Sequence, residues 1–140
     1  MARTRSSSGR RDERGIAVVE LALLLPILAV VLFGLVEFGL AFRSHEVLSQ
    51  ASREAVRYGV RPTEPKPSEG EIRQRAMDFL DSAGLSSDRS TVVVTGAGGE
   101  SGEQLRVQVQ YPASIAVFRL MKGSSPGTIT LSSEGVLEHE

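Results

Sequence analysis

The stretch Ile16-Ala-Val-Val-Glu20-Leu-Ala-Leu-Leu-Leu-Pro26-Ile-Leu-Ala-Val-Val-Leu-Phe-Gly34-Leu-Val-Glu37-Phe-Gly39-Leu-Ala-Phe42 decides the organisation of this 140-residue chain. Two of its 27 residues are charged, Glu20 and Glu37. A helix that crosses a bilayer needs about 20 apolar residues, so the stretch predicts one transmembrane helix over residues 16–42. A cleavable secretory signal would be shorter, about 7–15 apolar residues followed by a small-residue cleavage site. A buried helix of a soluble domain would need more apolar surface around it than residues 43–140 supply.

Basic residues flank this segment on its N-terminal side. Residues 1–15 contain five arginines and two acidic residues, a net charge of +3, whereas the whole chain carries −1. Because basic flanks stay on the cytoplasmic side of a membrane, we expect a single-pass protein of the cell membrane, with its N-terminus in the cytoplasm and its C-terminal region outside. Basic residues confined to a short leader do not form the surface of a nucleic-acid-binding domain, so we expect no nucleic-acid partner.

Residue types that carry catalysis or bind cofactors are sparse. The chain has no cysteine, and its two histidines, His45 and His139, lie far apart in the sequence. His139 falls in a chain end that we expect to be frayed. The glycine-rich segment 96–102 lacks the Lys-Ser/Thr pair that follows it in a phosphate-binding loop. We therefore predict no enzyme activity, no metal or other cofactor and no small-molecule substrate.

The junction between leader and apolar segment places a carboxylate where lipid would surround it. Glu20 lies five residues after Gly15, and an ionisable residue in a membrane segment is a functional candidate because its burial in lipid is costly. If a protease cut between Gly15 and Ile16, the new ammonium of Ile16 and the carboxylate of Glu20 would share one helix face. Pairing of these charges between neighbouring subunits would set the register of a helical bundle. The alternative is that Glu20 sits at the cytoplasmic interface, only about 7.5 Å inward from the glycine, and snorkels to water.

The residues around this junction resemble a known family. The segment Gly15-Ile-Ala-Val-Val-Glu20-Leu-Ala-Leu-Leu-Leu-Pro26 is similar to the TadE-like pseudopilins of tight-adherence pilus systems, which are of the Flp type, type IVb. The similarity continues through Phe33-Gly-Leu-Val-Glu-Phe-Gly39 and resumes at Ala51-Ser-Arg-Glu-Ala-Val-Arg-Tyr58. Major Flp pilins usually carry a tyrosine after the glutamate, whereas Leu21 stands here. This departure fits a minor pseudopilin better than a main fibre subunit.

The resemblance implies a function in pilus assembly. A prepilin peptidase would process the chain after Gly15, and Glu20 would serve subunit registration. The expected partners are the lipid bilayer, that peptidase, other pilins and pseudopilins, and the pilus assembly platform. The alternative is a single-pass membrane anchor that presents a small extracytoplasmic binding domain and does not polymerise.

Three residues inside the apolar segment bear on how this helix would pack. Pro26 removes one helix hydrogen bond and is expected to kink the helix, a defect that membrane helices tolerate when neighbouring groups satisfy the backbone. Gly34 and Gly39 offer flat patches for the approach of another helix. Their spacing is not Gly-x-x-x-Gly, so no dimer motif is predicted.

The helix is expected to continue beyond the membrane. Residues 43–58 contain no proline or glycine, and Gly59 and Pro62 supply stop signals. On this extension Arg53, Arg57 and Arg61 recur at four-residue spacing. They are interpreted either as a docking face for an acidic partner or headgroups, or as a solvated face with local pairing to Glu54. A continuous helix from residue 16 to 58 would measure about 65 Å.

The remaining residues predict a small head. Three prolines make residues 61–70 an extended linker, and Ser68 with Glu71 forms a capping box for a short amphipathic helix that ends near Gly84. Residues 91–95 and 105–110 read as a β-hairpin around the glycine-rich segment, which Pro112 follows, and residues 128–134 read as a last strand. Residues 113–121 fit a loop, a short helix or a packing edge.

These observations predict an α+β protein with a long N-terminal transmembrane and stalk helix and a small antiparallel-sheet head, as in type IVb pilins. Its expected parts are a cytoplasmic basic leader (1–15), a transmembrane helix (16–42), an extracytoplasmic extension (43–60), a proline-rich linker (61–70) and an α+β head domain (71–140).

Overall fold

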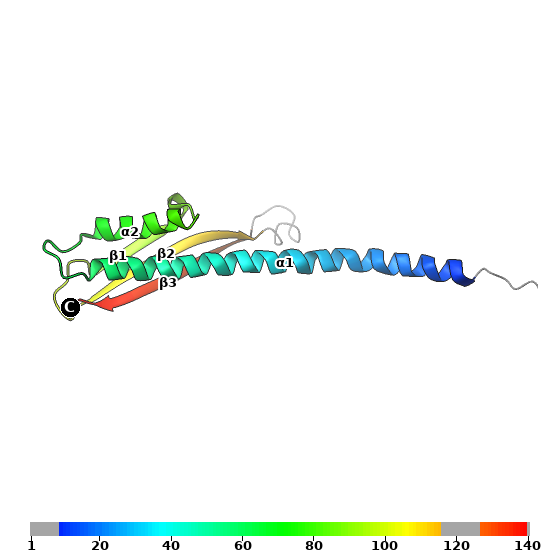
Figure 1. Cartoon of the computed structure of the whole chain (residues 1–140), viewed down its shortest axis with the longest axis horizontal. Coiled ribbons are helices and arrows are strands. Elements are labelled where there is room, and N and C mark those ends of the chain that lie inside the picture. The colour runs from blue at the N-terminus through cyan, green and yellow to red at the C-terminus, as the bar shows by residue number, and fades with distance from the viewer. Residues whose placement is uncertain (1–8, 116–126, 140) are drawn as a thin grey trace, which may run out of the picture.

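The computed structural model of the chain describes residues 9–115 and 127–139 and has the predicted α+β architecture (Figure 1). One long helix extends away from a small head of helix and sheet. In chain order the elements are α1 (Gly9–Gly59), α2 (Glu69–Ser82), the 3₁₀ helix η1 (Ser87–Arg89), β1 (Thr91–Thr95), β2 (Gln104–Ile115) and β3 (Gly127–Glu138).

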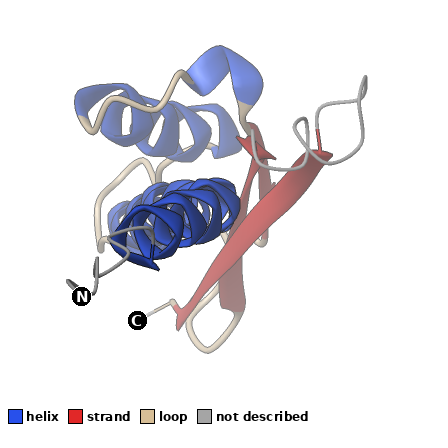
Figure 2. Ribbon diagram, turned by 90° about the vertical axis from the view of Figure 1, so that its right-hand side faces the viewer, coloured by secondary structure: helices blue, strands red, loops and turns tan. Residues whose placement is uncertain are grey.

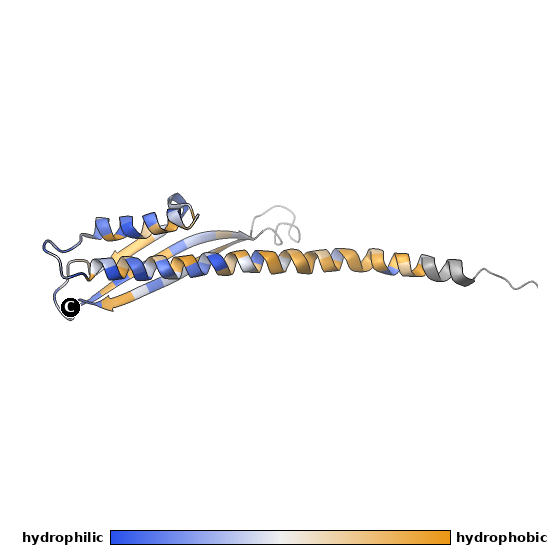
Figure 3. Ribbon diagram, viewed as in Figure 1, coloured by the Kyte–Doolittle hydropathy of each residue, from blue (hydrophilic) through white to orange (hydrophobic). Residues whose placement is uncertain are grey.

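Helix α1 confirms the predicted continuity of membrane segment and stalk. It contains 51 residues, which corresponds to about 77 Å at 1.5 Å per residue. It begins at Gly9, ahead of the expected start at residue 16, and it continues through Pro26 without ending. It ends at Gly59, as the stop signals predict. The half of α1 that projects from the head is the apolar half, and the half beneath the head alternates between apolar and polar residues (Figure 3).

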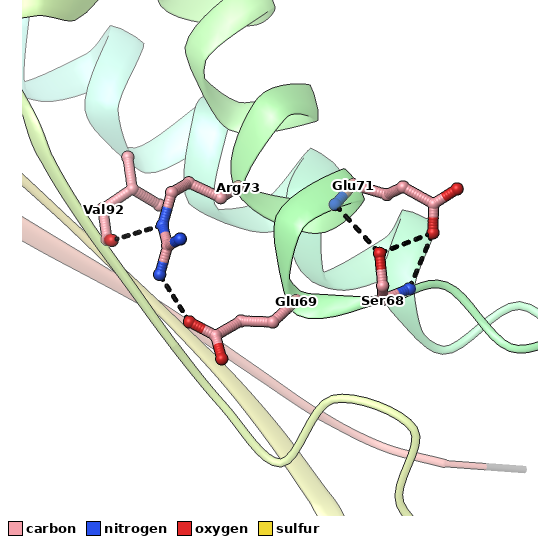
Figure 4. Close-up of polar contacts among 5 residues, drawn as sticks. All are labelled: Ser68, Glu69, Glu71, Arg73 and Val92. Atoms are coloured by element: carbon pink, nitrogen blue, oxygen red, sulfur yellow. Dashed lines mark hydrogen bonds and ion pairs between the residues drawn. The ribbon is translucent and has the colours of Figure 1, made fainter.

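The predicted capping box starts α2. The Ser68 hydroxyl accepts a hydrogen bond from the Glu71 backbone N–H at 3.3 Å, and the Ser68 backbone N–H donates to the Glu71 carboxylate at 2.8 Å (Figure 4). These contacts satisfy helix donors that otherwise have no intrahelical partner. The backbone hydrogen bond, followed by one from the Ser68 hydroxyl, lowers the pKa of Glu71. The helix closes at Gly84, which adopts φ +83°, the left-handed conformation that favours glycine.

The three strands form one antiparallel sheet in the order β1-β2-β3. In the first pair Val92 lies opposite Val109, and in the second Val109 lies opposite Ser133. Both helices cover the same face of this sheet, and the other face is open (Figure 2). The core lies between them, and its buried residues are Leu48, Ala51, Ala55, Val56, Ile72, Ala76, Leu80, Val92, Val94, Leu105, Val107, Val109 and Tyr111.

Strand β2 corrects one expectation, because it does not end before Pro112 but continues to Ile115. Strand β1 pairs with β2 only as far as Gln110, so β2 has a free edge beside the proline. The Pro112 carbonyl points to that edge, where it accepts a hydrogen bond from Arg89 at 3.0 Å. The proline nitrogen of an extended residue lies on the same side as its carbonyl, so its missing N–H removes no ladder hydrogen bond. Of the segment 113–121, residues 116–121 lie outside the described residues.

The end of the chain is also more ordered than expected. His139 is only 5% exposed, and its Nε2 lies 2.9 Å from the Gly96 carbonyl. Its backbone N–H donates to the Glu103 carbonyl at 2.9 Å. Across the same turn, the Lys66 ammonium donates to the Gly99 carbonyl at 2.6 Å. The glycine-rich turn after β1 is therefore held by the linker and by the C-terminal strand.

Candidate functional site

The projecting half of α1 exposes its apolar side chains on every side. Ile16 is 67% exposed and Phe38 71% exposed. Within Gly15–Gly59 the most apolar window has a mean hydropathy of 2.9 and none of it is buried inside the molecule. Such a surface is stable only in lipid or against other helices. This single long apolar helix near the N-terminus is compatible with single-pass membrane anchoring.

The predicted processing junction lies within this helix. Gly15 and Ile16 both have helical backbone and are exposed. A Cβ placed on Gly15 would meet no atom within 4 Å. In this uncleaved chain the Ile16 nitrogen is an amide, so it has no ammonium to offer Glu20.

The Glu20 carboxylate is exposed on the helix surface, one turn after Ile16. Ile16 and Glu20 share a face because they are four residues apart. No hydrogen bond or ion pair joins Glu20 to any residue whose side chain the structure describes. Within the described residues, the Glu20 carboxylate is therefore available to pair with a group from another molecule.

The two predicted packing glycines stand in open space. A Cβ on Gly34 or Gly39 would meet no atom within 4 Å, so neither glycine is required by contacts inside the molecule. Five residues of α-helix rotate by about 140°, which places the two glycines on different sides of α1. The structure therefore does not combine them into one flat face.

The stalk arginines divide between the two interpretations. Arg57 Nε lies 4.0 Å from the Glu54 carboxylate, which agrees with the predicted local pairing. The sequence pattern missed Arg75 of α2, whose guanidinium donates to Glu54 at 2.9 Å and connects the two helices. The hydrogen bond from Arg75 lowers the pKa of Glu54, partial burial opposes this shift, and the charge of Arg57 adds to it. Arg61 stacks over the Tyr58 ring at 5.1 Å.

Residues that sequence reasoning did not single out meet where the stalk leaves the head. A hollow of about 220 Å³ lies there between α1 and the end of β2. A second hollow of about 330 Å³ lies beside it, and the two share the lining residues Leu40, Ser44 and Leu85. No sequence signal marks them, because their walls come from three segments that are distant in the sequence, residues 37–47, 83–89 and 111–114.

Side chains typical of metal centres do not cluster in the described part of the chain, where no group of three His, Asp or Glu residues could hold an ion.

Comparison with known proteins places the helical segment in a family. Residues 15–57 match the family model described as TadE-like protein, which confirms the resemblance predicted from the sequence. The match starts at Gly15 and ends two residues before α1 does, so it covers the apolar segment and the stalk. No match was found among curated proteins or among solved structures. The likeness to this family is therefore confined to α1, and the head lies outside the matched residues.

Proposed function

We propose that this TadE-like chain is a minor pseudopilin-like membrane protein of a tight-adherence type IVb pilus. A prepilin peptidase cuts it after Gly15, and the mature N-terminus then packs with other pilins and pseudopilins on the assembly platform. The leader stays in the cytoplasm and the head lies outside the membrane. The observation that carries this proposal is the start of the family match at Gly15, the residue at which the basic leader meets the apolar segment.

The exposed carboxylate one turn after the junction supports the assembly step. Cleavage would convert the Ile16 amide into an ammonium at the end of an apolar helix, where an unpaired charge is costly. The Glu20 carboxylate of a neighbouring subunit is a partner of opposite charge at similar depth. Because the two residues lie four apart on one face, a pairing between subunits displaces the helices by about 6 Å along their axes. Cleavage would thereby couple processing to the register of assembly.

Glu20 is a clean target for mutation because it has no hydrogen bond or ion pair with any side chain that the structure describes. Glu20→Gln removes the charge without disturbing any contact of the described head, so the variant should insert and fold normally. We expect it to be processed but to be lost from assembled pili. The matched control is Glu46→Gln, an exposed glutamate on the same helix beyond the apolar segment.

The experiment reads processing and assembly separately. Mass spectrometry of membrane-extracted chain identifies the mature N-terminus, and immunoblotting of sheared surface fibres measures assembly. A mature chain that begins at Ile16, with assembly lost in the Glu20 variant alone, is the expected result. An intact leader would overturn the processing step. A Glu20 variant that assembles as well as the Glu46 control would overturn the registration role of Glu20, and absence of the wild-type chain from sheared fibres would favour the non-polymerising membrane anchor.

A further inference from the structure

The underside of the head is the strongest feature that the pilus role leaves unused. The two hollows open there around α1 residues 37–47, at the level where the apolar colouring of α1 gives way to polar colouring (Figure 3). The apolar segment ends at Phe42, and Arg43 is the first basic residue after Arg14. If residues 16–42 span the bilayer, the hollows lie in the headgroup layer of the outer leaflet.

The walls of the hollows are amphipathic. Leu40 and Leu85 line both of them, and Ala41, Ala83, Pro112 and Ala113 add further apolar surface. Ser44, Ser114 and Tyr111 also line the first hollow, and the Ser44 hydroxyl donates to the Leu40 carbonyl at 3.0 Å. Apolar walls beside hydroxyl groups suit a molecule that has both a polar and an apolar part.

Two guanidinium groups stand in these walls. Arg89 lines the first hollow and Arg43 the second. Contacts hold the Arg89 guanidinium in place: it donates to the Pro112 carbonyl at 3.0 Å and lies 5.2 Å from the centre of the Tyr111 ring. An arginine has five donors, and the hydrogen bond to Pro112 uses one of them. Glu37 also lines the first hollow, so the described lining residues of the two hollows include two arginines and one glutamate.

We propose that the underside of the head binds a glycerophospholipid of the outer leaflet. Arg43 and Arg89 hold the phosphate, and Leu40 and Leu85 contact the glycerol and the first methylene groups of the acyl chains. Two features favour a lipid over other occupants: Leu40 and Ala41 place the hollows at the C-terminal end of the apolar segment of α1, and the guanidinium groups are complementary to a phosphodiester. The site would fix the head against the bilayer surface, and it does not depend on whether the chain polymerises.

The test measures lipid retention by the full-length chain. The protein is purified in detergent and titrated with phosphatidylglycerol, and bound lipid is counted by native mass spectrometry. Arg43→Gln and Arg89→Gln should each weaken retention by about tenfold, the loss typical of one charged hydrogen bond. The control Arg53→Gln removes an exposed arginine of the same helix that lies outside both hollows, and it should change retention by less than about twofold.

Two controls distinguish a loss of lipid binding from a loss of folding. Arg89→Gln also removes a contact to Pro112, so near-ultraviolet circular dichroism of the tyrosines must show an intact head. Arg43→Gln removes no contact among the described residues and therefore decides the question if the other variant unfolds. Equal retention by wild type and the Arg43 variant, or equal loss in the Arg53 control, would overturn the proposal. Displacement of the lipid by inorganic phosphate at equal concentration would overturn it too, because the apolar walls would then contribute nothing.

Discussion

Gly135 of β3 packs closely against α1, and its replacement by alanine tests this packing. A Cβ at this position would lie 2.8 Å from the Ser52 carbonyl oxygen, 3.0 Å from its carbon and 3.1 Å from Val56 Cγ2. Two of these atoms belong to the helix backbone, which cannot rotate away as a side chain can. We therefore expect Gly135→Ala to push β3 away from α1.

The expected cost follows from two opposing effects. Overpacking of a well-filled core typically costs about 1–3 kcal/mol. Replacing glycine by alanine within a strand regains about 0.5–1 kcal/mol, because the unfolded chain loses freedom. The free energy of unfolding should therefore fall by about 0–2.5 kcal/mol. The site has a backbone neighbour, so a value near the upper end is expected.

The assay is urea unfolding of the full-length chain in detergent micelles. The chain has no tryptophan and two tyrosines; Tyr111 lies in β2 and Tyr58 on α1 packs against the core, so tyrosine fluorescence reports head unfolding. The matched control is Gly70→Ala in the first turn of α2, where the new Cβ would lie 4.0 Å from the Ser68 hydroxyl. This variant should be neutral or more stable by up to about 1 kcal/mol. An unchanged or higher unfolding midpoint for Gly135→Ala would refute the reasoning.

Two further outcomes are expected in the same assay. Glu54→Gln should lower the free energy of unfolding by about 0.5–1 kcal/mol at pH 7 through loss of the pair with Arg75, on a carboxylate that is 25% exposed. The folded-state pKa of Glu54 lies below its ordinary value of 4.5, so its contribution is complete above that value and is lost as pH falls through the folded pKa; a difference from wild type that persists at pH 2.5 would contradict this. Ser68→Ala should cost about 1 kcal/mol by removing the N-cap, and an unaltered hydrogen-exchange rate in the first turn of α2 would count against it.

Much of the fold could be predicted from short-range pattern. The run of apolar residues after residue 15 predicted the membrane helix, and the absence of proline and glycine from 43 to 58 predicted its continuation. The capping box placed the start of α2, and alternation at Leu105, Val107 and Val109 predicted the buried face of β2. Each of these signals depends on residues within a turn or two of one another, where periodicity and local hydrogen bonding govern the backbone.

The candidate site also has one part that could be predicted from the sequence and one part that could not. Gly15, Ile16 and Glu20 are neighbours in the sequence, so their position at the mouth of an apolar helix could be predicted. The hollows beneath the head could not be, because Leu40, Arg89 and Pro112 meet only after the sheet has packed on the stalk. The apolar composition of residues 16–42 carries no information about which distant segments lie against their outer end.

The sequence by itself thus determined the long apolar helix, its continuation into the stalk and the element types of the head, since hydropathy and helical or strand periods are local properties. Only the tertiary structure decided that Arg75 pairs with Glu54, that His139 is buried against the Gly96 carbonyl and that β2 continues through Pro112. Each of these depends on contacts between segments distant in the sequence. A proline is acceptable in a strand where the neighbouring strand has ended. A histidine near the end of the chain is ordered where a turn offers it a carbonyl. Neither the end of the neighbouring strand nor the position of the turn can be predicted from the residues next to the proline or the histidine in the sequence.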